Sequence, residues 1–291
     1  MPRLTVLIPC KNERRNILAC LESVRPIADE ILVADSGSTD GTLEMLREAG
    51  GCRIIQRDYV NSADFKNWAI PQAKHEWVLV VDADERVTPA LAAEIKALLI
   101  SEPRQHAYQL RRNFFFLGHQ VKHGSFASAT MTRLIRRDLR YARRRVHADV
   151  IVPSGKVGLL QHRLQHFTVS DLENFIERQQ RYAAWSALDS FEEGKRMGIG
   201  KLLTHAPLRF LQTYLLRGVF LDGIPGLIVC GLLAYYTFLK DIKLWSLAND
   251  LSAEGELIHA PPPMAPVRPQ SPKYFKRVSD HPRPALADCH G

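Results

Sequence analysis

The stretch Trp77 to Glu85, WVLVVDADE, places five apolar residues directly before a group of three carboxylates. Its apolar part lacks the alternation of a half-exposed strand, so both faces must be covered, as in a parallel sheet packed between helices. Carboxylates cannot share that environment, because an unpaired buried carboxylate costs several kcal/mol. The acids therefore belong at the carboxyl end of the strand, which is the edge where open α/β sheets bind ligands.

The spacing of these acids favours a metal site. If the backbone stays extended, Asp82 and Asp84 point to one side and Ala83 to the other. Two carboxylates placed in this way suit Mg²⁺ or Mn²⁺, and such a cation suits a phosphate. The alternative is a solvated strand end that leads into a helix, since Thr88-Pro89 is a favourable helix start.

Strands and helices alternate over about the first hundred residues. β-rich runs occupy 4–10, 31–34 and 53–56, and each is followed by a helical pattern. This order predicts an α/β fold with a doubly wound, mostly parallel sheet of Rossmann type. Right-handed crossovers bring the carboxyl ends of the strands together, so we expect Pro9, Asp35 and Asp82 to line one crevice.

The formal net charge of +8 favours a polyanionic partner: nucleic acid, an anionic membrane surface or a phosphorylated substrate. Seven arginines lie between Arg133 and Arg145. Arg136 and Arg144 are the candidates among them for contact with an acceptor or a phosphate, because arginine forks bind phosphate oxygens in pairs. A solvated face is the alternative. No helix-turn-helix, RNP or zinc pattern accompanies the arginines, so we do not expect nucleic acid as the partner.

Cysteine usage and the N-terminus both favour a cytoplasmic protein. The five cysteines are scattered and show no CxxC, which indicates neither a disulfide framework nor a zinc site. The apolar run near the N-terminus is too short for a signal peptide, so we do not expect export.

The composition changes from Lys201 onward. An amphipathic pattern over 202–220 precedes a seventeen-residue uncharged run, Gly223 to Leu239, which is near the lower length limit for a membrane span. We expect an in-plane or re-entrant element on an anionic bilayer rather than a full span, with a buried helical hairpin or a dimer face as the alternative. The sequence thus predicts three regions: a catalytic domain over 1–170, a helical membrane-associating region over 171–250, and a proline-rich disordered tail over 251–291.

Four segments, LTVLIPCKNE, DSGSTDGT, FKNWAI and VLVVDADE, together resemble the family 2 glycosyltransferases of the GT-A fold. More narrowly, the chain is similar to the bacterial lipopolysaccharide-core β-glucosyltransferase branch, which the segments MTRLIRR, RVHA, LQHFT and RGVFLDGIPG also resemble. The resemblance extends over about residues 3 to 245, and its specificity lies in the order and spacing of the motifs.

The resemblance implies roles around a nucleotide-sugar donor, most often a UDP-sugar, and a divalent cation, Mg²⁺ or Mn²⁺. Pro9 and Glu13 would border the base and ribose, and Asp35 would accept a hydrogen bond from the base. Lys66 would lie near the base or phosphates. Asp82 would meet the ribose or a metal-bound water, and Asp84 would ligate the cation.

The base that removes the acceptor's proton is where the chain departs from the family. Relatives commonly carry glutamate where this chain has Ala148. Asp149 is the nearest carboxylate, but a shift of one residue in a strand reverses its direction, so it requires an irregular backbone. His147 is a second candidate, because its ordinary pKa is near neutrality. Asp82 and Glu85 are further alternatives.

These features predict a metal-dependent, inverting transferase. It would move a sugar, such as glucose, from a nucleotide-diphosphate donor to a hydroxyl of a lipopolysaccharide-core or other lipid-linked glycan. We expect it to act as a peripheral or monotopic protein on the inner face of the cytoplasmic membrane, with homo-oligomers an open question. One alternative is transfer to a polyprenyl phosphate. Another is a non-catalytic, nucleotide-sugar-binding membrane scaffold, which Ala148 suggests because relatives commonly carry glutamate at that position.

Overall fold

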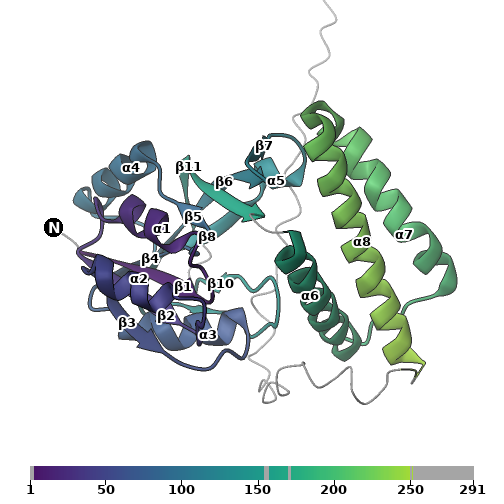
Figure 1. Ribbon diagram of the computed structural model, residues 1–291, viewed down its shortest axis with the longest axis horizontal. Coiled ribbons are helices and arrows are strands. Elements are labelled where there is room, and N and C mark those ends of the chain that lie inside the picture. Colours follow the sequence, from purple (N-terminus) through teal and green to yellow (C-terminus); the bar gives the residue numbers. More distant parts are fainter. Residues whose placement is uncertain (1–2, 154–156, 170–171, 250, 252–291) are drawn as a thin grey trace, which may run out of the picture. The chain divides into compact units, whose positions relative to one another are not determined.

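A nine-stranded mixed sheet forms the body of the chain in a computed structural model that describes residues 3–153, 157–169, 172–249 and 251 (Figure 1). Its strand order is β3-β2-β1-β4-β8-β6-β11-β5, and β7 pairs with β6. The strands are β1 (Leu4–Cys10), β2 (Glu30–Asp35), β3 (Arg53–Gln56), β4 (Trp77–Val80), β5 (Glu85–Arg86), β6 (Ala107–Phe116), β7 (His119–Val121), β8 (Thr130–Arg136) and β11 (Gly158–Val169).

The first four strands are parallel, as the sequence predicts, and β8 then inserts antiparallel between β4 and β6. Strand β11 is again parallel to β6, and the short β5 is antiparallel to β11. The doubly wound, mostly parallel sheet is therefore confirmed. The antiparallel β8 has a direct consequence for the site, because it brings residues from the middle of β8 to the carboxyl end of β4.

Helices cover both faces of the sheet. They are α1 (Ile17–Val24), α2 (Thr42–Ala49), α3 (Ser62–Ala69) with a 3-10 turn (Ile70–Gln72), and α4 (Pro89–Ile100). Apolar side chains of α1 and α4, including Leu21 and Leu91, pack with Val6 on one face. Phe65 of α3 packs with Leu7 on the opposite face. This is the alternation of a strand buried on both sides. A short helix, α5 (Ser125–Ser128), and a two-stranded ribbon, β9 (Arg140–Tyr141) with β10 (Val150–Ile151), complete this part.

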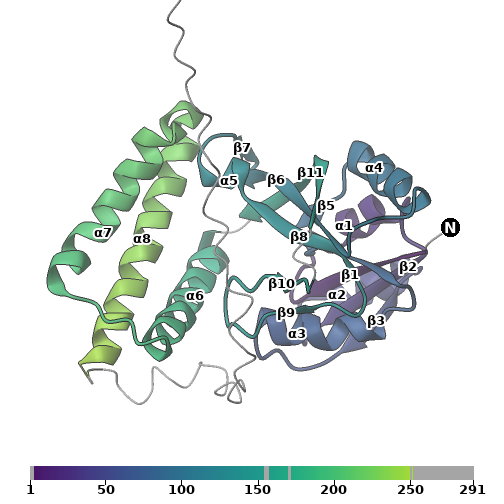
Figure 2. The same cartoon turned by 180° about the vertical axis from the view of Figure 1, so that it is seen from behind.

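Three long helices follow the sheet: α6 (Leu172–Glu192), α7 (Ile199–Leu211) and α8 (Gly223–Ala248). A π turn, η2 (Gln212–Leu216), and a 3-10 turn, η3 (Val219–Asp222), connect α7 to α8. Figures 1 and 2 show α8 lying between α6 and α7, and α8 packs against both. The uncharged run predicted from the sequence forms the first part of α8, which continues through Lys240 and Asp241.

Within the described residues, one segment, 219–248, is long and apolar enough to cross a membrane by length and composition. The described residues belong to one compact unit, Met1–Pro261. The boundary expected at 170/171 falls inside that unit, at residues outside the described ranges, and stays a prediction. The proline-rich tail from residue 252 onward also lies outside the described residues.

Candidate active site

Asp82 follows β4 and is held between two cations. Lys66 Nζ on α3 lies 3.2 Å from Asp82 Oδ1, and Arg133 Nη2 on β8 lies 2.5 Å from Asp82 Oδ2. Burial acts to raise the pKa of this carboxyl, but the charges of Arg133 and Lys66 outweigh burial and hold the pKa well below its usual range. Asp82 is therefore ionised at neutral pH and fixed in position.

Glu85 anchors the same network from inside the fold. Its side chain has no exposed surface, and its Oε1 accepts from Arg133 Nη2 at 2.9 Å and from Arg112 Nη1 at 3.2 Å. Its Oε2 accepts from the backbone N–H of Asp82 at 2.9 Å. A carboxylate bound at both oxygens and closed to solvent cannot reach an acceptor hydroxyl. The structure therefore supports neither Glu85 nor the ion-paired Asp82 as the catalytic base.

The backbone turns between Asp82 and Glu85, so it is not extended as the spacing argument assumed. The N–H of Glu85 donates to the C=O of Asp82 at 2.8 Å, and β5 then pairs with Gln165 and His166 of β11. The turn directs Asp84 toward β11, where its Oδ2 lies 3.4 Å from His166 Nε2. Asp82 and Asp84 consequently have separate partners, one a pair of cations and the other an imidazole.

Asp84 and His166 form a donor set that fits a divalent cation. Burial acts to raise the pKa of Asp84, but its interaction with His166 outweighs burial and lowers the pKa below its ordinary value, so a carboxylate is present. No group of three or more ligating side chains gathers in the described residues. Mg²⁺ and Mn²⁺ sites on enzymes commonly use one or two carboxylates, with water and substrate phosphates as the remaining ligands. The pair therefore fits a cation that is completed by a phosphorylated substrate.

Glu13 and Arg178 lie close enough to this pair to share its electrostatics. Burial raises the pKa of Glu13 to about 7, and the charge of Asp84 adds to the rise, while a hydrogen bond from Asn16 and the charge of Arg178 oppose it. The charge of Arg178 also lowers the pKa of Asp84. Arg178 belongs to α6 and donates to the C=O of Thr168 at 2.9 Å. Helix α6 thus supplies a cation that acts on both Glu13 and Asp84.

The nucleotide side of the predicted crevice begins at Pro9 and Asp35, which lie at the carboxyl ends of adjacent strands, with Pro9 beside Ala34. Asp35 is fully buried. Its Oδ2 accepts from the N–H groups of Gly37 and Ser38 at 2.9 and 3.0 Å, and its Oδ1 accepts from the Ser38 hydroxyl. Asp35 therefore holds the turn after β2, and direct contact with a nucleobase would require that turn to open.

The segment 142–149, between β9 and β10, carries both candidate bases on an irregular backbone. His147 has a left-handed φ of 53°, and both His147 and Asp149 are exposed. The irregular backbone removes the objection that Asp149 must point away from the site. Partial burial and the charges of Arg144 and Lys240 lower the pKa of His147, so its imidazole is neutral at pH 7.

Arg145 fastens this segment to α6. Its guanidinium is buried, with Nη1 2.7 Å from Asp189 Oδ1 and Nη2 2.6 Å from Glu192 Oε1. Buried, hydrogen-bonded ion pairs of this kind hold one arrangement of the chain, because separating the partners would leave an unpaired charge. The position of His147 and Asp149 therefore depends on α6.

Tyr141 links the segment to the Asp82 network. The side chain of Asn67 binds the backbone of Tyr141 in both directions, at 2.9 and 2.8 Å, and Lys66 Nζ lies 5.5 Å from the Tyr141 ring centre. Burial raises the pKa of Tyr141, the charge of Arg133 opposes the rise, and the charges of Asp82 and Asp149 add to it. Its hydroxyl is buried and has no hydrogen-bond partner in the described part of the chain.

The structure does not bring Arg136 and Arg144 to this site. Because β8 is antiparallel to β4, Arg136 lies opposite Trp77 at the start of β4, with its guanidinium 4.5 Å from the Trp77 ring and paired with Glu76. Arg144 forms an exposed ion pair with Glu193 at 3.2 Å. Both arginines therefore have partners away from Asp82, Asp84 and Glu85, and their contact with an acceptor or a phosphate stays a prediction.

Four site residues had no assigned role in the sequence interpretation: Arg112, Arg133, His166 and Arg178. Arg133 was one of seven clustered arginines, and nothing in the cluster marks which of them is buried. Two segments of the resemblance contain residues of this group: LQHFT contains His166, and MTRLIRR contains Arg133.

Comparisons with known proteins show the family to which the chain belongs. The family described as Glycosyl transferase family 2 matches residues 5–160, which is more than half of the chain. The chain belongs to glycosyltransferase family 2. This glycosyltransferase is 31% identical over 249 residues to the lipopolysaccharide core biosynthesis glycosyltransferase LpsC of Rhizobium meliloti, with 83% of this chain and 92% of the relative covered. It is 27% identical to an uncharacterized glycosyltransferase of Rickettsia prowazekii, over 88% of this chain and 90% of the relative.

Among solved structures, the glycosyltransferase is similar to residues 1–349 of S. aureus TarS in complex with UDP-GlcNAc, at 13% identity and a TM-score of 0.46, with 85% of this chain and 92% of TarS 1–349 covered. It is also similar to glucosyl-3-phosphoglycerate synthase of Mycobacterium tuberculosis in complex with Mn²⁺, UDP and glucosyl-3-phosphoglycerate, at 23% identity and a TM-score of 0.33 over 39% of this chain and 44% of the synthase.

Proposed function

We propose that this glycosyltransferase transfers a hexose, with inversion, from a nucleotide-diphosphate sugar to a hydroxyl of a lipopolysaccharide-core or other lipid-linked glycan. The observation that carries the proposal is the pairing of Asp84 with His166, 3.4 Å apart, beside an ion-paired Asp82 at the carboxyl end of β4. The similarity to a lipopolysaccharide core biosynthesis glycosyltransferase supports the acceptor class.

In this proposal Asp84 and His166 hold Mg²⁺ or Mn²⁺, which when bound stabilises the negative charge of the departing diphosphate. Arg178 adds a second positive charge on the same side, since its charge acts on both Glu13 and Asp84. Lys66 lies between Asp82 and the Tyr141 ring, and in this proposal it meets the donor's base or phosphates. Pro9 and the turn held by Asp35 form the wall for a uracil base.

The proton of the acceptor hydroxyl passes to Asp149, with His147 as the alternative base. As the hydroxyl oxygen bonds to the anomeric carbon of the donor, the bond from that carbon to the diphosphate breaks, and the diphosphate leaves with the bonding electrons. Two observations favour Asp149. The backbone at His147 is irregular. The charges of Asp149 and of Asp82 both raise the pKa of Tyr141. His147 is the second candidate for the base, because its lowered pKa leaves a neutral nitrogen able to accept a proton.

The reaction is tested by incubating the purified full-length chain with UDP-, ADP- and GDP-sugars, Mg²⁺ or Mn²⁺, and core glycans truncated at successive positions. We expect transfer from one donor to one truncated glycan, with the anomeric configuration reversed in the product, as read by NMR. Asp149→Asn should remove most of the activity and His147→Gln little of it; the opposite result assigns the base to His147. Absence of transfer and of donor hydrolysis with every donor would contradict the proposal.

Two other functions predict different products. Transfer to a polyprenyl phosphate, which the apolar helices also suit, would give an acid-labile sugar phosphodiester in place of a glycoside. A scaffold without catalysis, suggested by Ala148, would bind the donor in calorimetry without turnover on any acceptor.

A further inference from the structure

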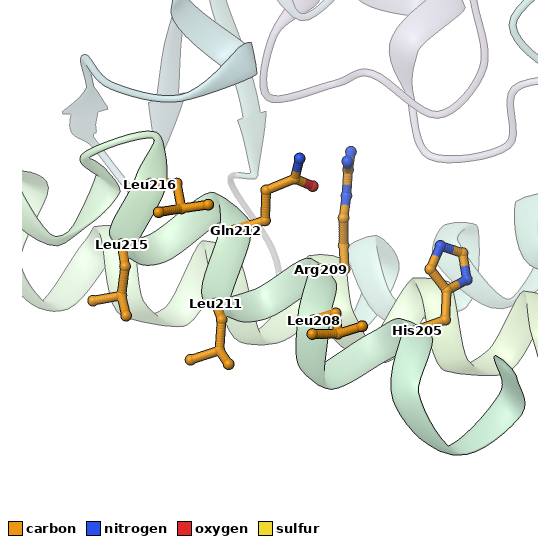
Figure 3. Close-up of a pocket in the computed structure, with 7 residues that line it drawn as sticks. All are labelled: His205, Leu208, Arg209, Leu211, Gln212, Leu215 and Leu216. Carbon is orange, nitrogen blue, oxygen red and sulfur yellow. The ribbon is translucent and has the colours of Figure 1, made fainter. Parts of the chain in front are cut away.

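The segment from α7 to the start of α8 exposes large apolar side chains in unusual number. We name the leucine face the set Leu203, Leu208, Leu211, Leu215, Leu216 and Ile224, whose members are 47 to 83% exposed. In Figure 3, Leu211 and Leu215 point to the same side of the helix, opposite to Arg209 and Gln212. Exposed apolar side chains that gather in one segment in this way are costly in water and mark an interaction site.

Basic residues outnumber acidic residues in the segment from α7 to the start of α8. Between Ile199 and Leu239 the basic residues are Lys201, Arg209 and Arg217, and the single acid is Asp222. Asp222 is turned inward, where its carboxylate accepts from the backbone N–H groups of Lys122 and His123, each at 3.0 Å. The leucine face therefore presents apolar groups with positive flanks and no exposed carboxylate among residues 199–239.

Helix α8 cannot cross a bilayer while it keeps these contacts, although it is long enough. Its first end is fixed by Asp222 and by Val229, which packs with Phe116 and Val121 of the sheet. Its last turns are fixed by Leu244, which packs with Ala187 of α6. A spanning helix places its two ends on opposite sides of about 30 Å of hydrocarbon. Both ends of α8 are held by the same folded unit.

The interior of the helical layer also argues against a span. Asp241 of α8 is fully buried, and His205 Nδ1 of α7 lies 2.6 Å from its Oδ2. The buried stripe of α8 runs along the helix and includes Gly226, Cys230 and Thr237. One side of α8 thus packs against protein, and five of the six members of the leucine face belong to α7 and η2.

We infer that the leucine face docks in the plane of an anionic phospholipid bilayer, entering one leaflet without crossing it. The apolar side chains enter the acyl region, and the exposed Lys201 and Arg217 reach lipid phosphates at its margin. A second copy of the chain is a poorer occupant, because a symmetric contact would place the same basic residues against each other. The inference deepens the proposed function by naming the surface that meets a lipid-linked acceptor.

Sedimentation of the full-length chain with lipid vesicles tests the docking without using transferase activity. We expect the chain to pellet with phosphatidylcholine vesicles that contain phosphatidylglycerol, and to pellet far less with phosphatidylcholine alone. The triple variant Leu211→Gln, Leu215→Gln, Leu216→Gln should weaken binding by at least about 10-fold. Ile100→Gln, which removes an exposed isoleucine from α4, is the matched control and should leave binding unchanged.

Three outcomes would overturn the docking: a chain that stays in the supernatant with both vesicle types, a triple variant that binds as the parent does, or a dimer that the triple variant abolishes while vesicles bind nothing. Raised salt should weaken binding, and Lys201→Gln with Arg217→Gln should reduce the preference for phosphatidylglycerol.

The in-plane arrangement has its own test. Leu221→Cys and Asn249→Cys, near the two ends of α8, are made separately in a chain whose five native cysteines are replaced by alanine. Each variant is exposed to a membrane-impermeant maleimide in spheroplasts of the expressing bacterium. We expect neither cysteine to be labelled until the cells are lysed. Labelling of one end alone would establish a span and contradict the inference. Because neither assay measures sugar transfer, docking and the proposed reaction can fail separately.

Discussion

The acidic edge, by which we mean Asp82, Asp84 and Glu85 with their contacting side chains, and the leucine face solve opposite problems of solvation. At the acidic edge, charged groups are removed from water and held by ion pairs such as Arg133 to Glu85 at 2.9 Å. On the leucine face, apolar groups such as Leu216 remain in water. Neither arrangement is favourable by itself, since buried charges lose hydration and exposed leucines order water.

This difference shows which groups are fully paired within the chain and which can still bind a ligand or another surface. The pairs of Asp82 and Glu85 are complete within the chain, so they provide a rigid base for the site. Asp84 has one imidazole partner and the leucine face has no covering element among the described residues, so each presents unused binding capacity. The predictions below separate the complete part of the acidic edge from its incomplete part.

The largest expected effect is the loss of activity on changing Asp84, the carboxylate whose binding capacity is not filled within the chain. Asp84→Asn removes the charge that would bind the cation, and we expect kcat/KM to fall by about 10³-fold or more, which corresponds to roughly 4 kcal/mol. Sugar transfer is measured with the donor that the parent chain uses. Asp138→Asn, at an exposed aspartate on the turn after β8, is the control and should retain activity. Equal activity in both variants would show that Asp84 takes no part in the reaction.

Breaking the ion pairs of Asp82 and Glu85 should lower the stability of the fold. Arg133→Met leaves the carboxylates of Asp82 and Glu85 facing each other without their shared cation, and we expect the free energy of unfolding to fall by about 3 kcal/mol. Urea unfolding followed by circular dichroism measures the change. Arg143→Met, which alters an exposed arginine, should change stability by less than about 0.5 kcal/mol. A similar small change in Arg133→Met would contradict the anchoring role.

A smaller effect is expected where α6 positions the catalytic segment. Arg145→Met breaks the pairs with Asp189 and Glu192, and the freed segment should lower kcat by about 10-fold with little change in the KM of the donor. Steady-state kinetics at varied donor and acceptor concentrations separate the two constants. Arg143→Met alters an exposed arginine of the same segment and is the control. If donor KM rises while kcat is unchanged, Arg145 supports the donor site and not the base.

The smallest effect concerns pH. Because burial raises the pKa of Glu13 to about 7, the folded chain holds a proton that the unfolded chain loses near its ordinary pKa. Stability should therefore fall as pH rises from about 4.5 to about 7 and stay level above it. With divalent cations chelated, Glu13→Gln should be more stable than the parent at pH 8, by about 1 kcal/mol, and equal to it at pH 4.5. Glu48→Gln, at an exposed position, should show no such pH-dependent difference.

The sequence predicted the scaffold of the acidic edge well, for a physical reason. An unbroken apolar run such as Trp77 to Val81 requires cover on both faces, and the structure buries every one of these residues. The FKNWAI segment is one of the motifs of the resemblance, and its residues contact the site. Lys66 contacts Asp82 and Asn67 fixes the backbone of Tyr141.

The partners of the acids could not be predicted, because they come from strands whose pairing leaves no local signal. Arg133 and Glu85 are 48 residues apart, and only the antiparallel insertion of β8 brings them together. The same insertion carries Arg136 to the other end of β4, so seven similar arginines acquire different roles. The turn after Asp82 was missed because the spacing argument assumed an extended backbone.

The central claim is that Asp84 and His166 bind a divalent cation together with a nucleoside diphosphate. Isothermal titration calorimetry of UDP binding, with and without Mn²⁺ after chelation, tests it most directly. We predict UDP binding to the parent chain that requires Mn²⁺, and binding at least about 10-fold weaker in Asp84→Asn. Equal affinity in the two chains, or binding that is unaffected by removal of the cation, would contradict the account.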